Sequence, residues 1–253
     1  MPYLNSEVFY RTLDPDSCDL VTARPRAMAL AVEKGELDGG PLPVAEVFRL
    51  GNRVREVGEL GVAIHGKVLS VLLLSDVPAE QLDGQRIAIT EDTATSVQLL
   101  RVLCADHWKI KPELVAPGSE APARLIIGDE ANRLRKVGNS PYVYDLSEEW
   151  HKLTRLPFVF AVWVLRSDLP EAEFKAFEKA LVDAYCEGRQ RVDEIAAARK
   201  TEWMSEAECA EYVRNFSYTI GEAERRGMQE FHRRLTALPS WRPPAPALTV
   251  RIS

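Results

Sequence analysis

The sequence predicts an α/β protein of two lobes, with two crossover strands between them and a helical C-terminal segment. Three observations predict this fold. Apolar segments of strand length alternate with helical patterns through the first two-thirds of the chain. Two of these segments, residues 68–74 and 158–165, are almost wholly apolar and enclose about 80 residues, the size of a small domain. Beyond residue 170 the pattern is helical almost to the end.

The simplest topology makes the enclosed segment a lobe inserted into the other. Lobe one then comprises residues 1–75 and 159–253, and lobe two comprises residues 76–158. A double crossover of this kind is the architecture of type II periplasmic binding proteins. The alternation of strands and helices predicts parallel sheets with helices on their faces. In such sheets ligands bind at the carboxyl ends of strands, here between the lobes.

The predicted elements of lobe one begin with a helix over residues 6–13, for which Asn5 or Ser6 is the N-cap. A second helix begins at Pro25, a residue suited to the first helical position, and ends near Gly35. The remaining elements of this part of the chain are a strand over 37–43, a helix over 44–50 and an extended stretch over 61–64 and 67–75.

The predicted elements of lobe two are read from the same signals. They are a strand at 86–90, a helix at 95–103, a strand at 124–128, a strand at 142–145 and a helix at 147–154 capped by Ser147. The C-terminal third is predicted as helices over 171–198, 205–215 and 220–238. The proline-rich tail 241–246 cannot continue a helix and is expected to wrap the surface.

The composition argues against several classes of function. The net charge of −6 offers no basic surface for nucleic acid. It also repels an anionic ligand at long range, so such a ligand would depend on local donors. The four cysteines are scattered without metal-ligand spacing, which predicts reduced thiols and no metal site. No membrane-length apolar run or export signal is present, so we expect a cytoplasmic protein with no membrane partner.

Short polar residues stand where strands meet helices. They are Asn5 and Ser6, then Thr93, Thr95 and Ser96, then Gly128 and Asp129. Free backbone N–H groups at helix starts are the usual means of holding a carboxylate. The alternative is that each residue only caps its helix, as such residues commonly do. If the two-lobed topology holds, all three junctions face one cleft.

Two further polar residues have open interpretations. Ser70, at the start of a crossover strand, either faces the cleft or merely begins the strand. His65, in the loop before it, has the chemistry of an acid or base, but a loop histidine beside glycine is more often exposed and without a role. Asp145, Glu148 and Glu149 begin a helix, where the helix dipole favours acidic residues, and are interpreted as structural. The aromatic residues Trp150, Phe158, Phe160 and Trp163 are assigned to the core.

Several segments occur in a characteristic order over residues 3–166. They are Tyr3-Leu4-Asn5, Gly35-Glu36-Leu37-Asp38, Ser70-Val71-Leu72-Leu73-Leu74-Ser75, Thr95-Ser96, Ile127-Gly128-Asp129-Glu130-Ala131, Tyr142-Val143-Tyr144-Asp145-Leu146-Ser147-Glu148-Glu149-Trp150 and Leu156-Pro157-Phe158-Val159-Phe160-Ala161-Val162-Trp163. This ordered set resembles the chorismate dehydratase family of menaquinone biosynthesis.

The resemblance implies a type II periplasmic-binding-protein-like fold recruited as an enzyme. The family removes water from chorismate to give 3-[(1-carboxyvinyl)oxy]benzoate, in the futalosine route to menaquinone, without cofactor or metal. It implies Asn5 as the catalytic residue against the reacting ring. The residues implied in substrate binding are Tyr3, Ser70, Thr95, Ser96, Gly128 and Asp129. The partner implied is a small dicarboxylate, chorismate, and the protein is expected to be a monomer or a homodimer.

The alternative function is a solute-binding protein or sensor that uses the same cleft for a small carboxylate without chemistry. Another is the sister enzyme of the pathway, which splits a futalosine derivative. Its opening motif, Pro-Asn-Asp-Thr, is not matched by Leu4-Asn5-Ser6-Glu7.

Overall fold

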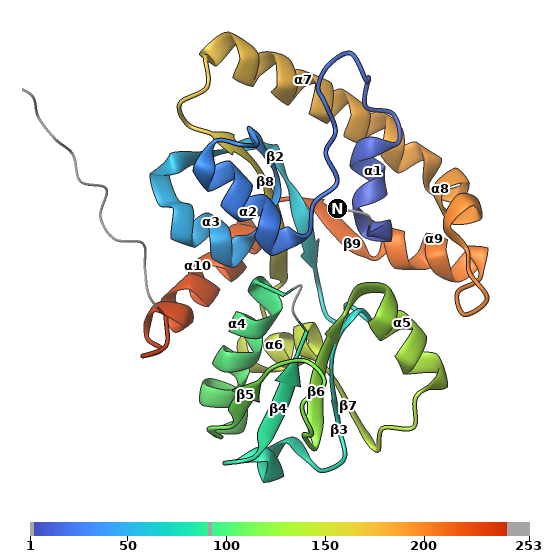
Figure 1. The fold of residues 1–253 in the computed structure, drawn as a ribbon. Coiled ribbons are helices and arrows are strands. Elements are labelled where there is room, and N and C mark those ends of the chain that lie inside the picture. The colour runs from blue at the N-terminus through green and yellow to red at the C-terminus, as the bar shows by residue number, and fades with distance from the viewer. Residues whose placement is uncertain (1–2, 91–92, 242–253) are drawn as a thin grey trace, which may run out of the picture.

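The computed structural model describes residues 3–90 and 93–241. Figure 1 shows two lobes, with the N-terminal and C-terminal parts of the chain in one and the middle part in the other. Each lobe is built on its own sheet. The strand order is β1-β8-β2-β9 in the first and β5-β4-β6-β3-β7 in the second. The two-lobed α/β fold predicted from the sequence is confirmed by this arrangement.

The first sheet contains the strands that connect the lobes. Its strands are β1 (Gly39–Pro43), β2 (Val54–Ile64), β8 (Phe158–Arg166) and β9 (Phe216–Thr219). All of its pairings are antiparallel, so the prediction of parallel sheets is wrong here. The reason is topological: β2 leaves the lobe and β8 returns to it, and strands that run in opposite directions pair antiparallel.

The second sheet is mixed. Its strands are β3 (Val71–Ser75), β4 (Arg86–Ile89), β5 (Glu113–Val115), β6 (Ala123–Ile127) and β7 (Tyr142–Asp145). β4 runs parallel to β5 and β6, whereas β3 is antiparallel to β6 and β7. By sheet membership, residues 71–75 therefore go with the second lobe and not with residues 1–70. The division of the chain into lobes otherwise stays a prediction.

Helices cover both sheets, and most begin where the sequence predicted. They are η1 (Leu4–Ser6), α1 (Glu7–Tyr10), α2 (Pro25–Lys34), α3 (Val44–Leu50), α4 (Thr95–Val102), α5 (Gly128–Val137), α6 (Leu146–Thr154), α7 (Glu171–Gly188), α8 (Val192–Arg199), α9 (Glu206–Arg214) and α10 (Glu222–Thr236), with short turns at Gly51–Arg53, Ala79–Leu82 and Arg189–Arg191. α4 continues as a wider π-helix, Leu103–Trp108.

Both ends of α2 agree with the sequence signals, whereas the start of α6 requires a correction. Pro25 opens α2, and Gly35 closes it with φ of 75°, a conformation that glycine adopts without strain. The N-cap of α6 is Asp145 and not Ser147 as predicted. The Asp145 carboxylate accepts hydrogen bonds from the backbone N–H groups of Ser147 and Glu148 at 3.0 and 3.2 Å.

The helical prediction for the C-terminal third missed one strand. β9 follows α9 directly and pairs with β2. Its side chains alternate, with Phe216 and Tyr218 buried and Thr219 exposed, which is the pattern of an edge strand over a core. The strand is only four residues long, and this explains why the longer helical patterns around it concealed it.

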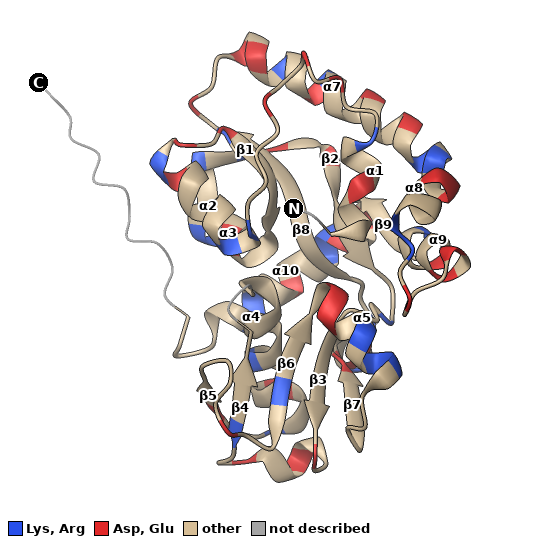
Figure 2. Ribbon diagram, turned by 45° about the vertical axis from the view of Figure 1, so that its right-hand side comes forward, with Lys and Arg blue, Asp and Glu red and all other residues tan. Residues whose placement is uncertain are grey.

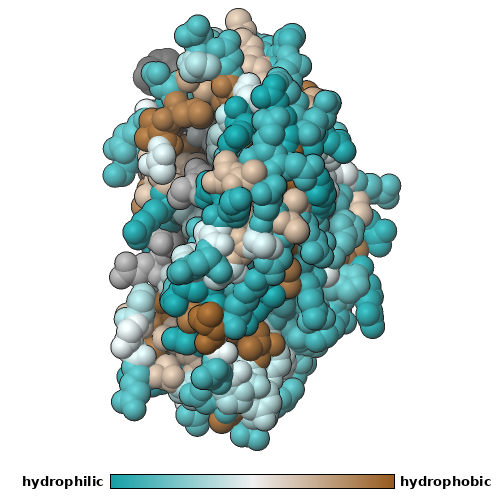
Figure 3. Space-filling model, turned by 90° about the vertical axis from the view of Figure 1, so that its right-hand side faces the viewer, coloured by the Kyte–Doolittle hydropathy of each residue, from teal (hydrophilic) through white to brown (hydrophobic). Residues whose placement is uncertain are grey.

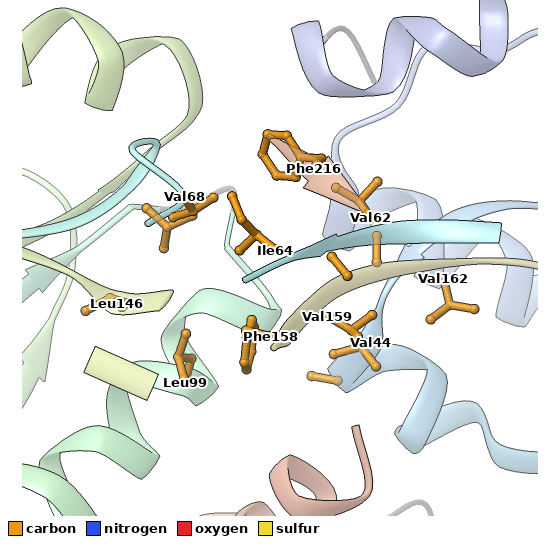
Figure 4. Close-up of a cluster of buried hydrophobic side chains, with 14 of the residues drawn as sticks. Val44, Val62, Ile64, Val68, Leu99, Leu146, Phe158, Val159, Val162 and Phe216 are labelled. Atoms are coloured by element: carbon orange, nitrogen blue, oxygen red, sulfur yellow. The ribbon is translucent and has the colours of Figure 1, made fainter. Parts of the chain in front are cut away.

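The core is continuous between the lobes at the crossover. Ile64 and Phe158 are paired where the two crossover strands leave the first sheet. Figure 4 shows them beside Val68, Leu99 and Leu146 from the second-lobe side of the crossover, and all are buried. Trp150 and Trp163 are also buried, as predicted. The prediction fails for Phe160, which is only partly buried and packs at the edge of the core.

The surface of the described residues fits a globular protein. The face in Figure 3 is mostly hydrophilic, with hydrophobic residues in small separate patches. All four cysteines are free thiols, as predicted. Among residues 3–90 and 93–241, no helix combines the length and hydropathy that a membrane crossing requires.

Candidate functional site

A cavity of about 730 Å³, including its open mouth, lies where the two lobes meet. Every residue that the sequence singled out for the site lines it: Tyr3, Asn5, Ser70, Thr95, Ser96, Gly128 and Asp129. The lining comes from η1, the β2–β3 connection, the starts of α4 and α5, β8 and α9. The convergence expected from the double crossover is thus present in the structure, whereas the chemical role of each residue stays a prediction.

Asn5 lines the cavity from η1. The hydroxyl of the fully buried Ser6 donates to Asn5 Oδ1 at 3.3 Å. The backbone N–H of Ser6 in turn donates to the Tyr3 carbonyl at 3.0 Å. The contact with Ser6 orients the Asn5 amide, and its Nδ2 has two donors that it can offer to a ligand.

The start of α4 contains two hydroxyls with different surroundings. Thr95 Oγ1 donates to the Phe160 carbonyl and accepts from the Ala45 N–H, both at 3.3 Å. This hydroxyl therefore connects the lobes, and Thr95 can offer a ligand its backbone N–H. Ser96 lines the same cavity, and the structure records no hydrogen-bond partner for its hydroxyl within residues 3–90 and 93–241. Ser96 is thus the available side-chain donor of this helix start.

The start of α5 is held close to Ser70. The Gly128 N–H donates to the Ser70 carbonyl at 2.8 Å, and Gly128 has φ of +66°. A Cβ atom at this position would lie 3.0 Å from the Tyr3 ring. The backbone conformation therefore favours glycine, and a larger residue would also have to displace the Tyr3 ring slightly. Asp129 follows and also lines the cavity.

Ser70 lines the cavity, so the cleft-facing interpretation is the correct one. Its hydroxyl lies 2.7 Å from the phenol oxygen of Tyr212. The preceding residue, Leu69, has a left-handed conformation with φ of 66°. Asp145 Oδ2 accepts the Leu69 N–H at 2.7 Å and so holds this strained turn in place. Burial raises the pKa of Asp145, although backbone donors oppose the shift.

Tyr212, on α9, is the site residue that sequence reasoning missed. It is 5% exposed and lines the cavity beside Phe216. Burial raises the pKa of Tyr212 well above its usual range, so the phenol keeps its proton at neutral pH. The only sequence signal was its place on the buried face of a helix, which is shared by many core tyrosines.

His65 lies outside the cavity lining. Its Nε2 contacts Glu224 Oε1 at 2.9 Å, and its side chain is 55% exposed. Of the two interpretations, an exposed residue without a role in the cavity is the one that the structure favours.

Most of the cavity lining is apolar, and none of its described lining residues is a lysine or arginine. Asp129 is the one acidic residue among them. The polar groups that can bond a ligand come from the starts of α4 and α5 and from Asn5, Ser70 and Tyr212. Phe160, Phe216 and Val62 add an apolar wall. Such a site suits a small, flat, carboxylated molecule.

Comparisons with known proteins agree with this geometry. A family profile described as "Menaquinone biosynthesis" matches residues 1–237. A chorismate dehydratase of Thermus thermophilus is 32% identical over 194 residues, which cover 68% of this chain and 70% of that protein. The resemblance stated from the ordered segments is therefore confirmed.

Solved structures with low identity show the fold. A crystal structure of an Archaeoglobus fulgidus protein matches with a TM-score of 0.74 and 16% identity, covering 93% of this chain and 94% of that chain. The ligand-binding component of an ABC-type import system from Staphylococcus aureus matches with a TM-score of 0.62 and 16% identity, covering 96% and 90%. These neighbours confirm the periplasmic-binding-protein-like fold predicted from the sequence.

Proposed function

We propose that this chain, which belongs to the menaquinone biosynthesis family, is a chorismate dehydratase, a carbon–oxygen lyase. Family membership follows from the profile match over residues 1–237. The activity is supported by the chorismate dehydratase that is 32% identical. The observation that carries the proposal is the meeting of Asn5, Ser70, Ser96 and two helix starts around one cavity.

The proposed reaction is the loss of water from chorismate. The C3–H and C4–O bonds break, the ring becomes aromatic, and the products are water and 3-[(1-carboxyvinyl)oxy]benzoate. No electrons are exchanged with another molecule, so the elimination balances without a redox partner. The enzyme must hold the substrate rigidly, exclude water and stabilise the departing oxygen.

The residues divide these tasks. We assign the substrate carboxylates to Ser70, Ser96 and the N–H groups that begin α4, because neutral donors at a helix start stabilise anions. Asn5 is assigned to the reacting ring, where its Nδ2 donors can reach the departing oxygen. Tyr3, Thr95 and Gly128 shape the cavity around the substrate. We assign the removal of the C3 proton to the enolpyruvyl carboxylate of the substrate.

The wider setting is also proposed. The substrate partner is chorismate, and no nucleic acid or membrane takes part. We infer a cytoplasmic monomer or homodimer that works without cofactor, consistent with a biosynthetic role.

The direct test incubates the purified protein with chorismate and follows formation of the aromatic enolpyruvyl ether by absorbance and mass. We expect stoichiometric conversion. Tight binding of chorismate without product would contradict the enzyme proposal and favour the alternative, a solute-binding protein or sensor of the same fold.

A variant tests the assignment of Asn5. Asn5→Ala removes the amide donors and is expected to lower kcat by at least about 100-fold, the loss typical of one transition-state donor. Asn139→Ala, the same change at an exposed turn residue, serves as the control and should leave kcat unchanged. Near-normal turnover by Asn5→Ala would remove Asn5 from the catalytic set.

A further inference from the structure

We propose that Tyr212 is a positioning residue that directs the Ser70 hydroxyl toward a carboxylate of the substrate. The inference rests on the proposed function, because it concerns how the same cavity binds chorismate. It adds a residue from the C-terminal third of the chain, where neither helix pattern nor sequence resemblance indicated a part of the site.

The contact itself is short and buried. Tyr212 Oη and Ser70 Oγ are 2.7 Å apart, and the two residues are 5% and 4% exposed. Both residues line the cavity. The Tyr212 ring is fixed by an edge-on contact with Phe216, with ring centres 5.1 Å apart. The phenol oxygen is therefore held in one place relative to Ser70.

Either hydroxyl could donate in this contact, and we infer the direction from the other acceptor of Ser70. The other acceptor recorded for the Ser70 hydroxyl is the Val68 carbonyl, at 3.4 Å, which is a long and weak contact. An anionic carboxylate is a far better acceptor for the same proton. When Tyr212 donates to Ser70 Oγ, the Ser70 proton is released to the ligand, and each bond in the chain polarises the next.

Tyr212 belongs to a surface of α9 that contacts the second lobe. Glu208 lies one helical turn before Tyr212, on the same face of α9. Its carboxylate pairs with Lys136 of α5 at 2.5 Å. One face of α9 thus contacts both Lys136 of α5 and Ser70 in the connection between β2 and β3. The position of the Tyr212 phenol is therefore fixed by α9 on one side of the cavity and by this connection on the other.

The test is a double-mutant cycle of Tyr212→Phe and Ser70→Ala. Kd and KM for chorismate are measured with kcat for both single variants and the double variant. Tyr212→Phe keeps the ring and its contact with Phe216, and should raise Kd and KM about tenfold, the factor expected for weakening one hydrogen bond to a charged group. The value of kcat should change much less.

Because Tyr212 acts through Ser70, adding Tyr212→Phe to the Ser70→Ala variant should not raise Kd any further. The matched control is Tyr218→Phe. Tyr218 is an equally buried phenol whose hydroxyl donates to the Val213 carbonyl at 3.1 Å, outside the cavity lining. This variant should lose stability but leave Kd unchanged.

Different outcomes would overturn the role of Tyr212 and the proposed enzyme activity. Equal losses from Tyr212→Phe with and without the Ser70 hydroxyl would overturn the inference while leaving the enzyme proposal intact, as would an equal loss in Tyr218→Phe. Binding of chorismate without turnover by the unmodified protein would overturn the enzyme proposal, and the cycle measured on Kd would still decide the inference. Failure of the unmodified protein to bind chorismate would overturn both.

Discussion

The starts of α4 and α5 face the same cavity, yet they differ in charge. The first turn of α4 has no acidic residue, and it begins with Thr95 and Ser96. The first turn of α5 contains Asp129 and Glu130. Figure 2 shows acidic residues at the start of α5 and basic residues toward its end. Two helix starts that line the same cavity thus differ in the charge of their first turns.

The difference implies that the two helix starts bind different parts of the substrate. The start of a helix has a partial positive charge that attracts anions, and nearby carboxylates cancel it. The start of α4 is therefore suited to a substrate carboxylate. The start of α5 is suited to a neutral hydroxyl, which can donate to the Asp129 carboxylate. Chorismate contains both groups.

The largest expected effect comes from giving α4 the charge of α5. Ser96→Asp places a carboxylate where the substrate carboxylate is proposed to bind, and like charges in a partly buried site repel strongly. We expect a loss of chorismate affinity of at least about 100-fold, measured by calorimetry. Ser96→Asn introduces a neutral side chain of the same size as aspartate, so it is the control and should lose about tenfold or less. Similar losses in both variants would show that size and not charge matters here.

The reciprocal change on α5 should have a smaller effect. Asp129→Asn weakens the acceptor for the substrate hydroxyl, and we expect KM for chorismate to rise about tenfold. The product lacks that hydroxyl, so its inhibition constant should stay the same or improve as the repulsion disappears. If affinity for the product falls as much as affinity for chorismate, Asp129 does not distinguish the hydroxyl.

A third change tests the backbone of α5. Gly128→Ala forces a Cβ atom into a left-handed residue next to Tyr3, and we expect a loss of roughly 2 kcal/mol in the free energy of unfolding. Gly118→Ala is the control, because Gly118 has φ of +76° with open space around it. Gly118→Ala should lower the free energy of unfolding by about 1 kcal/mol. Equal losses in denaturant unfolding would mean that the contact with Tyr3 is easily relieved.

The smallest effect is expected at the end of α5. Hydrogen bonds from the Lys136 ammonium, and after it from the backbone N–H and hydroxyl of Ser205, lower the pKa of Glu208 to about 2. The lowered pKa stabilises the fold fully above the ordinary carboxyl range, and this stability is lost as the pH falls from there toward 2. Lys136→Met should therefore be slightly less stable than the unmodified protein near neutral pH, with the two converging in acid.

The pair formed by Lys136 and Glu208 is exposed, so its effect should also fade at high salt. Denaturant unfolding at several pH values and salt concentrations measures both trends. Lys111→Met, at an exposed position, is the comparison variant. If the free energies of unfolding of Lys136→Met and the unmodified protein differed by the same amount from strongly acidic to neutral pH, an effect through Glu208 would be excluded.

Much of the site was predictable because its signals are local. Ser96 and Gly128 stand at junctions where a strand pattern gives way to a helix pattern, and the double crossover brings such junctions together. Their places follow from residues within a few positions of each in the chain. The same logic explains why α2 began and ended where Pro25 and Gly35 indicated.

The features that sequence did not predict are those that depend on distant partners. The Thr95 hydroxyl is hydrogen-bonded to the backbone of Ala45 and Phe160 in the other lobe. No pattern in the nearby sequence predicts these contacts. Tyr212 reaches the cavity only because β9 pairs with β2 and sets the place of α9. The antiparallel first sheet likewise results from the direction in which the chain returns.

The pairing of β2 with β8 also has a consequence for synthesis of the protein. The whole second lobe lies between these two strands in the chain, so it can collapse on the ribosome before its neighbour has a complete sheet. β1 and β2 must wait for β8, because β8 is the strand between them. We therefore expect the second lobe to fold first during translation, and the long wait to make the nascent first lobe the part that depends on chaperones.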